Sequence, residues 1–182
     1  MLFRSSAFYF DIRKDVLYCD PINSKKRKST IILLKIILNS LLKWFAPILS
    51  FTTEEIYRLI KKNNKSIHLE KFINFPKNFE NKQLDDKWSK LNKIRDICNI
   101  SIEEKRSSKE IGSSLEANID IKLNKEYFEI SKNIDFSELC ITSKASISEN
   151  NDKNIVVETT KAKGNKCPVC WKISIDPCNR HS

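Results

Sequence analysis

Residues 31–51 read IILLKIILNSLLKWFAPILSF and form the most apolar stretch of the chain. Apolar residues recur every three or four positions, which is the period of one helix face. Further apolar residues widen the stripe, so the pattern predicts a helix at the centre of a helical bundle. Lys35, Lys43 and Pro47 interrupt the stretch and would be disfavoured in the middle of a bilayer. We therefore interpret it as a buried helix of a soluble protein and exclude a membrane span.

The helical pattern continues after this stretch. Pro47 predicts an end or a kink, and Thr52 and Glu55 have the spacing of a capping box that starts the next helix. The expected buried face of that helix consists of Ile56, Leu59 and Ile60. A third helix is predicted over 81–106, with one apolar side that carries Leu84, Trp88, Leu91, Ile94 and Cys98. The segment 63–79 between them is expected to be an irregular connection packed on the bundle.

The hydrophobic period then changes from that of a helix to that of a strand. Residues 115–123, LEANIDIKL, alternate strictly between apolar and polar, which is typical of a strand with one solvated face. Gly112 precedes this strand where a helix-to-strand turn favours a positive φ. A weaker alternation follows over 139–147, then a polar stretch over 148–154 and a short strand over 155–157. The predicted fold is mainly α: a helical bundle over 1–108, a small α/β domain over 109–154 and a zinc-binding segment over 155–182.

Composition limits the function classes. The chain has 182 residues, a formal net charge of +10 and only 2 Gly, which excludes a collagenous or Gly-rich linker protein. The basic balance favours a polyanionic partner, nucleic acid before membrane. Lys far outnumbers Arg, so part of the charge also fits the codon usage of an AT-rich genome. The sequence lacks a Gly-rich phosphate loop and a Ser/His/Asp arrangement, which indicates a binding module without a catalytic site.

The cysteines fall into two groups. Cys19, Cys98 and Cys140 are scattered singly, as expected of free thiols in a reducing cytosol. The other three combine with a histidine in a C-x2-C-x7-C-x2-H pattern, which comprises Cys167, Cys170, Cys178 and His181. Three thiolates and one imidazole suit a closed, structural Zn²⁺ site. Incidental cysteines, or a disulfide within the C-x-x-C, are the alternatives.

Two further features bear on a nucleic-acid partner. The basic run Lys25, Lys26, Arg27 and Lys28 lies at a predicted helix start, where a solvated charge run is the alternative to a binding site. Trp171 follows the C-x-x-C turn, and it either stacks on a base or packs over the metal loop.

Four strings resemble one protein family. Residues 6–20 (SAFYFDIRKDVLYCD), 41–57 (LLKWFAPILSFTTEEIY) and 111–117 (IGSSLEA) are similar to motifs of the anticodon-binding part of bacterial isoleucyl-tRNA synthetases. Residues 166–172 (KCPVCWK) resemble the C-terminal zinc finger of that family. Tyr57 stands where the family usually has Trp, and His181 stands where it usually has a fourth Cys.

The resemblance implies the C-terminal fragment of a longer cytoplasmic ligase that uses ATP to join isoleucine to its tRNA. Its catalytic domain, with the HIGH and KMSKS motifs, and its editing domain are absent from this sequence. The implied partners are an isoleucine-accepting tRNA and those missing domains. The expected tRNA-binding residues are Arg13, Lys14, Lys25, Lys26, Arg27, Lys28, Trp171, Lys172 and Arg180. The alternative function is a free-standing zinc-containing RNA-binding or scaffold protein.

Overall fold

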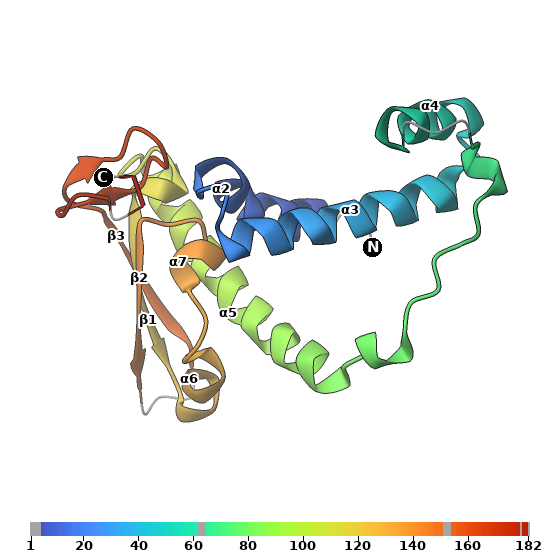
Figure 1. Ribbon diagram of the computed structural model, residues 1–182. Helices are drawn as coiled ribbons and strands as arrows, with labels where there is room; N and C mark the ends of the chain where they lie inside the picture. The colour runs from blue at the N-terminus through green and yellow to red at the C-terminus, as the bar shows by residue number, and fades with distance from the viewer. Residues whose placement is uncertain (1–4, 62–64, 151–153, 179, 182) are drawn as a thin grey trace. The chain divides into compact units, whose positions relative to one another are not determined.

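The computed structural model describes residues 5–61, 65–150, 154–178 and 180–181, and Figure 1 shows the elements that they form. The chain divides into two compact units. The sheet unit combines residues 1–15 with 81–182, and the helical unit is the segment 16–80 between them. The predicted order of helices followed by a small α/β part is confirmed. The division into sequential domains at 108 and 154 stays a prediction.

The helical unit is built on two α-helices. They are α3 (Lys25–Phe45) and α4 (Ser50–Lys61), followed by the short 3-10 turns η2 (Ile67–Leu69) and η3 (Lys77–Phe79). Ser24 caps α3 by accepting a hydrogen bond from the amide of Arg27. The buried core of this unit is small and consists of Leu42, Ala46, Tyr57 and Ile67. Residues 62–64, where the predicted connection begins, lie outside the described residues.

The burial expected for 31–51 is wrong. Ile32 and Trp44 are 59% and 53% exposed, and the buried residues of α3 are Thr30, Ser40 and Leu42. Periodicity shows that a residue belongs to an apolar face, but it does not show that another element covers that face. Of the stripe itself, Ile31, Leu34, Leu41 and Phe45 are half-buried and Leu38 is exposed, so this face of α3 is only partly covered by the described residues.

The start and the buried face of α4 also differ from the prediction. The helix begins at Ser50, so Thr52 lies inside it and does not cap it. The hydroxyl of Thr53 donates to the carbonyl of Leu49, at 2.9 Å. The buried residues are Thr53 and Tyr57, whereas Leu59 and Ile60 are exposed. The helical face that carries Tyr57, and not the more hydrophobic one beside it, faces the core of this unit.

The sheet unit contains the longest helix, α5 (Lys82–Ser107), as predicted. Asn81 caps it by accepting a hydrogen bond from the Leu84 amide at 3.0 Å. Its inner face carries Leu91, Ile94, Cys98 and Ile102, all of them buried. The spacing of three and four residues matches one face of a helix. Leu84, expected on this face, is exposed because the first turn extends beyond the core.

The sheet of this unit has three strands in the order β2-β1-β3. The central strand β1 (Ala117–Leu123) pairs in parallel with β2 (Lys144–Glu149) and antiparallel with β3 (Val156–Lys161). The short helices α6 (Lys125–Ser131) and α7 (Phe136–Leu139) connect β1 to β2 (Figure 1). Alternate residues of β1 enter the core, which confirms the predicted strand; they are Ala117, Ile119, Ile121 and Leu123.

The sheet unit also contains helical segments before the helical unit and directly before β1. The π-helical segment η1 (Ser5–Phe10) leads into α2 (Asp11–Cys19), whose later residues enter the helical unit. The 3-10 turn η4 (Ser114–Glu116) precedes β1. The positive φ after α5 belongs to Lys109, at 60°, and not to Gly112 as predicted. The left-handed residue lies directly after the helix, where the amide of Glu110 closes the last turn on the carbonyl of Lys105.

The C-terminal hairpin consists of β4 (Asn165–Lys166) and β5 (Ile173–Ser174). Gly164 starts it with a φ of 125°, and a Cβ atom at this position would lie 2.2 Å from the carbonyl oxygen of Ser174. Only glycine permits this close crossing. The amide of Ile173 donates to the hydroxyl of Ser143 at 2.6 Å, which fixes the hairpin to the segment before β2. Within the described ranges, none of the helices combines the length and the hydropathy that a membrane span requires.

Candidate functional site

The four residues of the predicted metal pattern lie together in the structure. One ligand atom from each of them lies within 4.8 Å of all the others, and the residues are Cys167, Cys170, Cys178 and His181. The Sγ atoms of Cys170 and Cys178 are 3.8 Å apart. Nδ1 of His181 is 3.5 Å from Sγ of Cys167 and 3.2 Å from Sγ of Cys178. Ligands around a tetrahedral zinc ion are separated by about 3.5–3.8 Å, and these three distances are close to that range.

The local backbone explains why the first two cysteines converge. The amide of Trp171 donates to the carbonyl of Cys167 at 3.0 Å, and the amide of Cys167 donates to the carbonyl of Lys172 at 2.9 Å. These bonds close the C-P-V-C segment into a turn, and Trp171 leaves it with a φ of 64°. Cys167 and Cys170 are both buried inside this turn.

The same turn sets the protonation of the thiols. The backbone N–H groups of Cys170 and Val169 hydrogen-bond to the Cys167 sulfur and lower the pKa of Cys167 to about 6. Burial raises the pKa of Cys170 to about 11. A bound cation would favour the thiolate at both positions. None of the six cysteines forms a disulfide in the structure, so the C-x-x-C is unbridged there.

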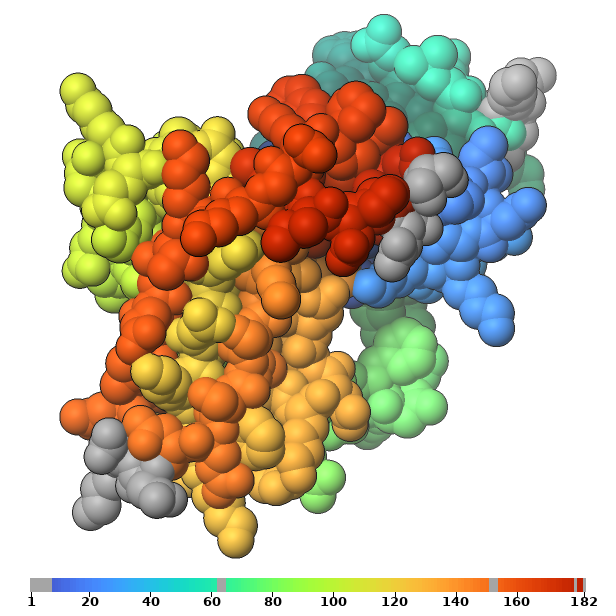
Figure 2. All heavy atoms as spheres, turned by 90° about the vertical axis from the view of Figure 1, so that its left-hand side faces the viewer, coloured from blue at the N-terminus to red at the C-terminus, as the bar shows by residue number. Residues whose placement is uncertain are grey.

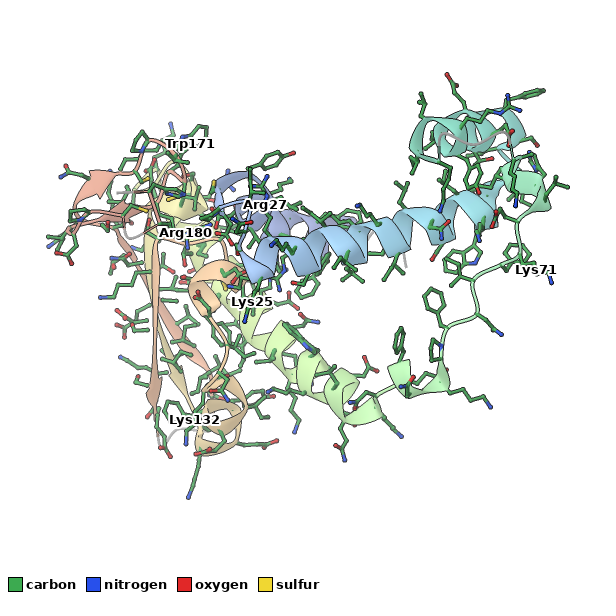
Figure 3. All side chains as sticks on the ribbon, in the orientation of Figure 1. Lys25, Arg27, Lys71, Lys132, Trp171 and Arg180 are labelled. Atoms are coloured by element: carbon green, nitrogen blue, oxygen red, sulfur yellow. The ribbon has the colours of Figure 1, made fainter. Side chains whose placement is uncertain are left out.

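The basic run at the start of α3 presents most of its charge to solvent. Lys25, Lys26 and Lys28 are exposed. Arg27 is half-buried, and its guanidinium donates to the carbonyl of Asp20 at 2.7 Å. Figure 3 shows Lys25 and Arg27 at the beginning of this helix. Arg27 therefore holds the connection between α2 and α3, and the three lysines remain the solvent-facing cations of the run.

Three of the other expected RNA-binding cations form ion pairs within the sheet unit. Arg13 contacts Glu138 at 2.5 Å, and Arg180 contacts Asp15 at 2.6 Å. Lys14 contacts Asp11 at 2.7 Å. The two arginine pairs are half-buried, so they connect α2 to α7 and to the C-terminal turn. Sequence spacing gives no sign of the two arginine pairs, because their partners are 125 and 165 positions apart in the chain.

The hairpin presents one large aromatic side chain. Trp171 is 57% exposed, and Nζ of Lys166 lies 5.0 Å from the centre of its ring. Figure 3 shows Trp171 and Arg180 on the C-terminal hairpin and turn. Lys172 points elsewhere, with its Nζ 3.5 Å from the hydroxyl of Ser137. Trp171 is exposed enough to stack on a base, and the two alternatives for its role stay predictions.

Comparison with known proteins identifies the family. Residues 3–123 match the sequence model described as "Anticodon-binding domain of tRNA ligase". The chain is 66% identical over 177 residues to "Isoleucine--tRNA ligase" of Pelagibacter ubique, covering 97% of this chain and 20% of that protein. It is 37% identical to the protein of the same name from Bartonella henselae, covering 94% of this chain and 19% of that protein. The chain thus spans about a fifth of the length of these curated relatives.

The family match covers about two thirds of the chain and includes α2, α3, α4, α5 and β1. It also contains three of the four strings that suggested the resemblance, at 6–20, 41–57 and 111–117. The chain belongs to the family of anticodon-binding domains of tRNA ligases.

Proposed function

We propose that this chain is the tRNA-binding C-terminal part of an isoleucine–tRNA ligase and that it binds the anticodon stem-loop of an isoleucine-accepting tRNA. The observation that carries the proposal is the 66% identity to a protein named isoleucine–tRNA ligase across 97% of the chain. The parent enzyme would activate isoleucine with ATP and transfer it to the tRNA in the cytoplasm. Catalytic and editing domains in the remaining four fifths of such a protein would be its covalent partners.

Binding at the anticodon would act on the chemistry from a distance. Free energy gained from remote contacts can orient the acceptor end of the tRNA for the transfer step. The cations best placed for this task are the exposed lysines at the start of α3, Lys25, Lys26 and Lys28. Their contacts to phosphate would be strongly salt-dependent.

We further propose that Cys167, Cys170, Cys178 and His181 hold one Zn²⁺ ion. Three sulfur atoms and one imidazole nitrogen within 4.8 Å of one another are the donor set that zinc prefers. Four protein ligands leave no open coordination position, so the ion would shape the C-terminal turn and take no part in a reaction. The hairpin buries little apolar surface of its own, and the metal would replace that missing core.

A free-standing RNA-binding or scaffold protein is the less favoured alternative. Relatives with similar sequences carry this segment within proteins about five times as long. Isoleucine-dependent ATP–pyrophosphate exchange separates the activity of the parent from that of this part. The purified 182-residue chain should show no exchange, because the family match concerns only anticodon binding.

The decisive measurement is the affinity of the purified chain for three tRNA transcripts. Two of them differ only in the anticodon, and the third belongs to another amino acid. An isoleucine-accepting transcript should bind more tightly than its anticodon-substituted copy, at one salt concentration. The tRNA of another amino acid serves as the second reference. Equal affinity for all three would contradict anticodon recognition.

A further inference from the structure

The sheet unit contains a groove that no sequence motif marks. Its volume is about 600 Å³, and it lies between the first residues of β1 and β2 and the C-terminal hairpin. Figure 2 shows the side of the molecule on which the hairpin, in red, borders the strands, in yellow and orange. We call it the lysine groove, and its polar lining includes Asn118, Ser143, Lys144, Lys161, Lys163 and Asp176.

The charge of the lysine groove is predominantly positive. Lys144, Lys161 and Lys163 are exposed and form no ion pair with any described residue. One carboxylate, that of Asp176, lies in the same lining. This arrangement differs from that of Arg13 and Arg180, whose charges are already paired. The groove therefore offers unneutralised cations in the sheet unit.

The strand register gives the groove a specific polar group. Asn118 on β1 lies opposite Lys144 on β2 and Thr160 on β3, so the three side chains lie on the same face of the sheet. The side-chain oxygen of Asn118 is buried and has no hydrogen-bond partner among the described residues. A buried amide oxygen without a partner is uncommon in folded proteins. An amide offers both a donor and an acceptor, which is the pattern of a nucleobase edge, and contact with a base requires the covered Asn118 oxygen to rotate toward the groove.

The walls of the groove are held in place by short contacts. The Ile173 amide donates to the Ser143 hydroxyl at 2.6 Å, and the Ala162 amide donates to the Glu116 carbonyl at 2.7 Å. Gly164 permits the chain to cross close to Ser174 between these two contacts. The groove is thus a preformed feature of the hairpin and the sheet. Its size fits about one or two nucleotides of a single strand.

We propose that the lysine groove binds a single-stranded segment of RNA, with phosphates at the three lysines and a base edge at Asn118. This inference rests on the proposed tRNA-binding function and adds a second contact surface to it, separate from the lysines of α3. Lysine ammonium groups bind phosphate without sequence preference, whereas the Asn118 amide would discriminate between bases.

The test compares two triple variants of the full chain that lose the same charge. The first is Lys144→Ala/Lys161→Ala/Lys163→Ala, and the control is Lys93→Ala/Lys125→Ala/Lys132→Ala on exposed positions of the same unit. The affinity for the isoleucine-accepting tRNA transcript is measured over a series of salt concentrations. The groove variant should lose about tenfold or more in affinity, and its logarithmic salt slope should fall by about 2. The control variant should change each quantity much less.

A pair of asparagine variants tests the base contact. Asn118→Ala should weaken binding by about three- to tenfold without changing the salt slope, because no charge is lost. Asn133→Ala, at an exposed position after α6, is its control. Thermal unfolding of each variant shows that the sheet unit remains folded.

The outcomes separate this inference from the proposed function. If the wild-type chain binds RNA and the two triple variants weaken binding equally, the lysine-groove proposal is overturned and anticodon binding is left intact. If the wild-type chain binds no RNA, both proposals are overturned. Millimolar inorganic phosphate at matched ionic strength should not displace the RNA, and full displacement would assign the groove to free phosphate. Displacement by polyglutamate of equal charge would assign it to an acidic peptide.

Discussion

In the sheet unit, α5 and β1 meet in a core of thirteen buried residues, whereas in the helical unit only four buried residues form the core. The helical unit nevertheless carries large apolar side chains, and Phe51, Leu59 and Leu69 are 92%, 73% and 82% exposed. The helical unit is thus the richer of the two in apolar residues, yet it has the smaller buried core. The difference indicates that the sheet unit can stabilise itself, while the helical unit gains little from its own packing.

The largest expected effect concerns the metal. Its removal shows whether the core of the sheet unit stays folded without the ion. Chelation, or Cys170→Ser, should unfold the chain from about residue 165 onward while α5 and the sheet stay protected from hydrogen exchange. Structural zinc supplies about 10 kcal/mol or more to small domains. His181→Ala should weaken metal binding less, because water can replace the imidazole while three thiolates still hold the ion. Elemental analysis of untagged protein should give one zinc per chain, with Cys19→Ser as the control.

Freshly reduced wild-type protein that contains less than one zinc per chain would contradict the metal site. A Cys167–Cys170 disulfide in place of the ion would contradict it too. Unfolding of α5 on chelation would instead contradict the independence of the sheet core. The two failures are distinguishable by the segments that lose protection.

The next effect compares burial in the two units directly. Ile121→Ala removes a fully buried side chain from β1 and should lower the free energy of unfolding by about 2–5 kcal/mol. Leu59→Ala removes an apolar side chain that is 73% exposed and should change it by about 0.5 kcal/mol or less. Urea denaturation followed by circular dichroism measures both. Equal losses would show that Leu59 is covered in solution.

A third, smaller effect separates the two glycines of the sheet unit. Gly164→Ala should destabilise the hairpin by about 1–3 kcal/mol, because its φ is 125° and the new methyl group would meet the Ser174 carbonyl. Gly112→Ala should be neutral or slightly stabilising, since the nearest atom to its Cβ would be a flexible Glu116 oxygen at 3.4 Å. Thermal unfolding and hydrogen exchange of the hairpin test the pair. A neutral Gly164→Ala would mean that the crossing of the chain at Ser174 is loose.

The smallest effect is a pH dependence within the helical unit. A hydrogen bond from the Ile67 amide, assisted by Arg58 and Ser66, lowers the pKa of Glu54 below its ordinary value of 4.5. A lowered carboxyl pKa stabilises the folded state above the ordinary value, and that contribution is lost as pH falls through the lowered one. Protection of η2 should therefore decrease on acidification in this range. Glu54→Gln should flatten the change, and the exposed Glu55→Gln should leave it as in the wild type.

Sequence reasoning was most successful where a pattern is local. The face of α5 with Leu91 and Ile94, the strand around Ile119 and the convergence of the metal pattern all follow from periodicity or spacing. Each of these features depends on residues within one element or one turn. The sequence could therefore predict the candidate metal cluster completely.

The errors arise where the outcome depends on distant partners. Ile32 belongs to an apolar stripe, but its burial depends on a neighbour that the stripe does not specify. The ion pairs of Arg13 with Glu138 and of Arg180 with Asp15 form only in the folded chain, so the sequence could not predict them, and RNA binding by these two arginines stays a prediction. Lys109 adopts the positive φ because the helix ends there, although Gly112 is the residue with that preference. Tertiary context decided all three.

The arginine pairs of α2 also constrain the order of folding. Asp15 and Arg180 are 165 positions apart, and Arg13 and Glu138 are 125 apart. During synthesis, the helix that carries Asp15 and Arg13 emerges long before either partner exists, so the sheet unit must be completed last. The helical unit is an insertion that can fold before the partners of that helix have been synthesised. Because the entropy of closing a loop grows only slowly with its length, a long insertion delays completion of the sheet unit more than it lowers its stability.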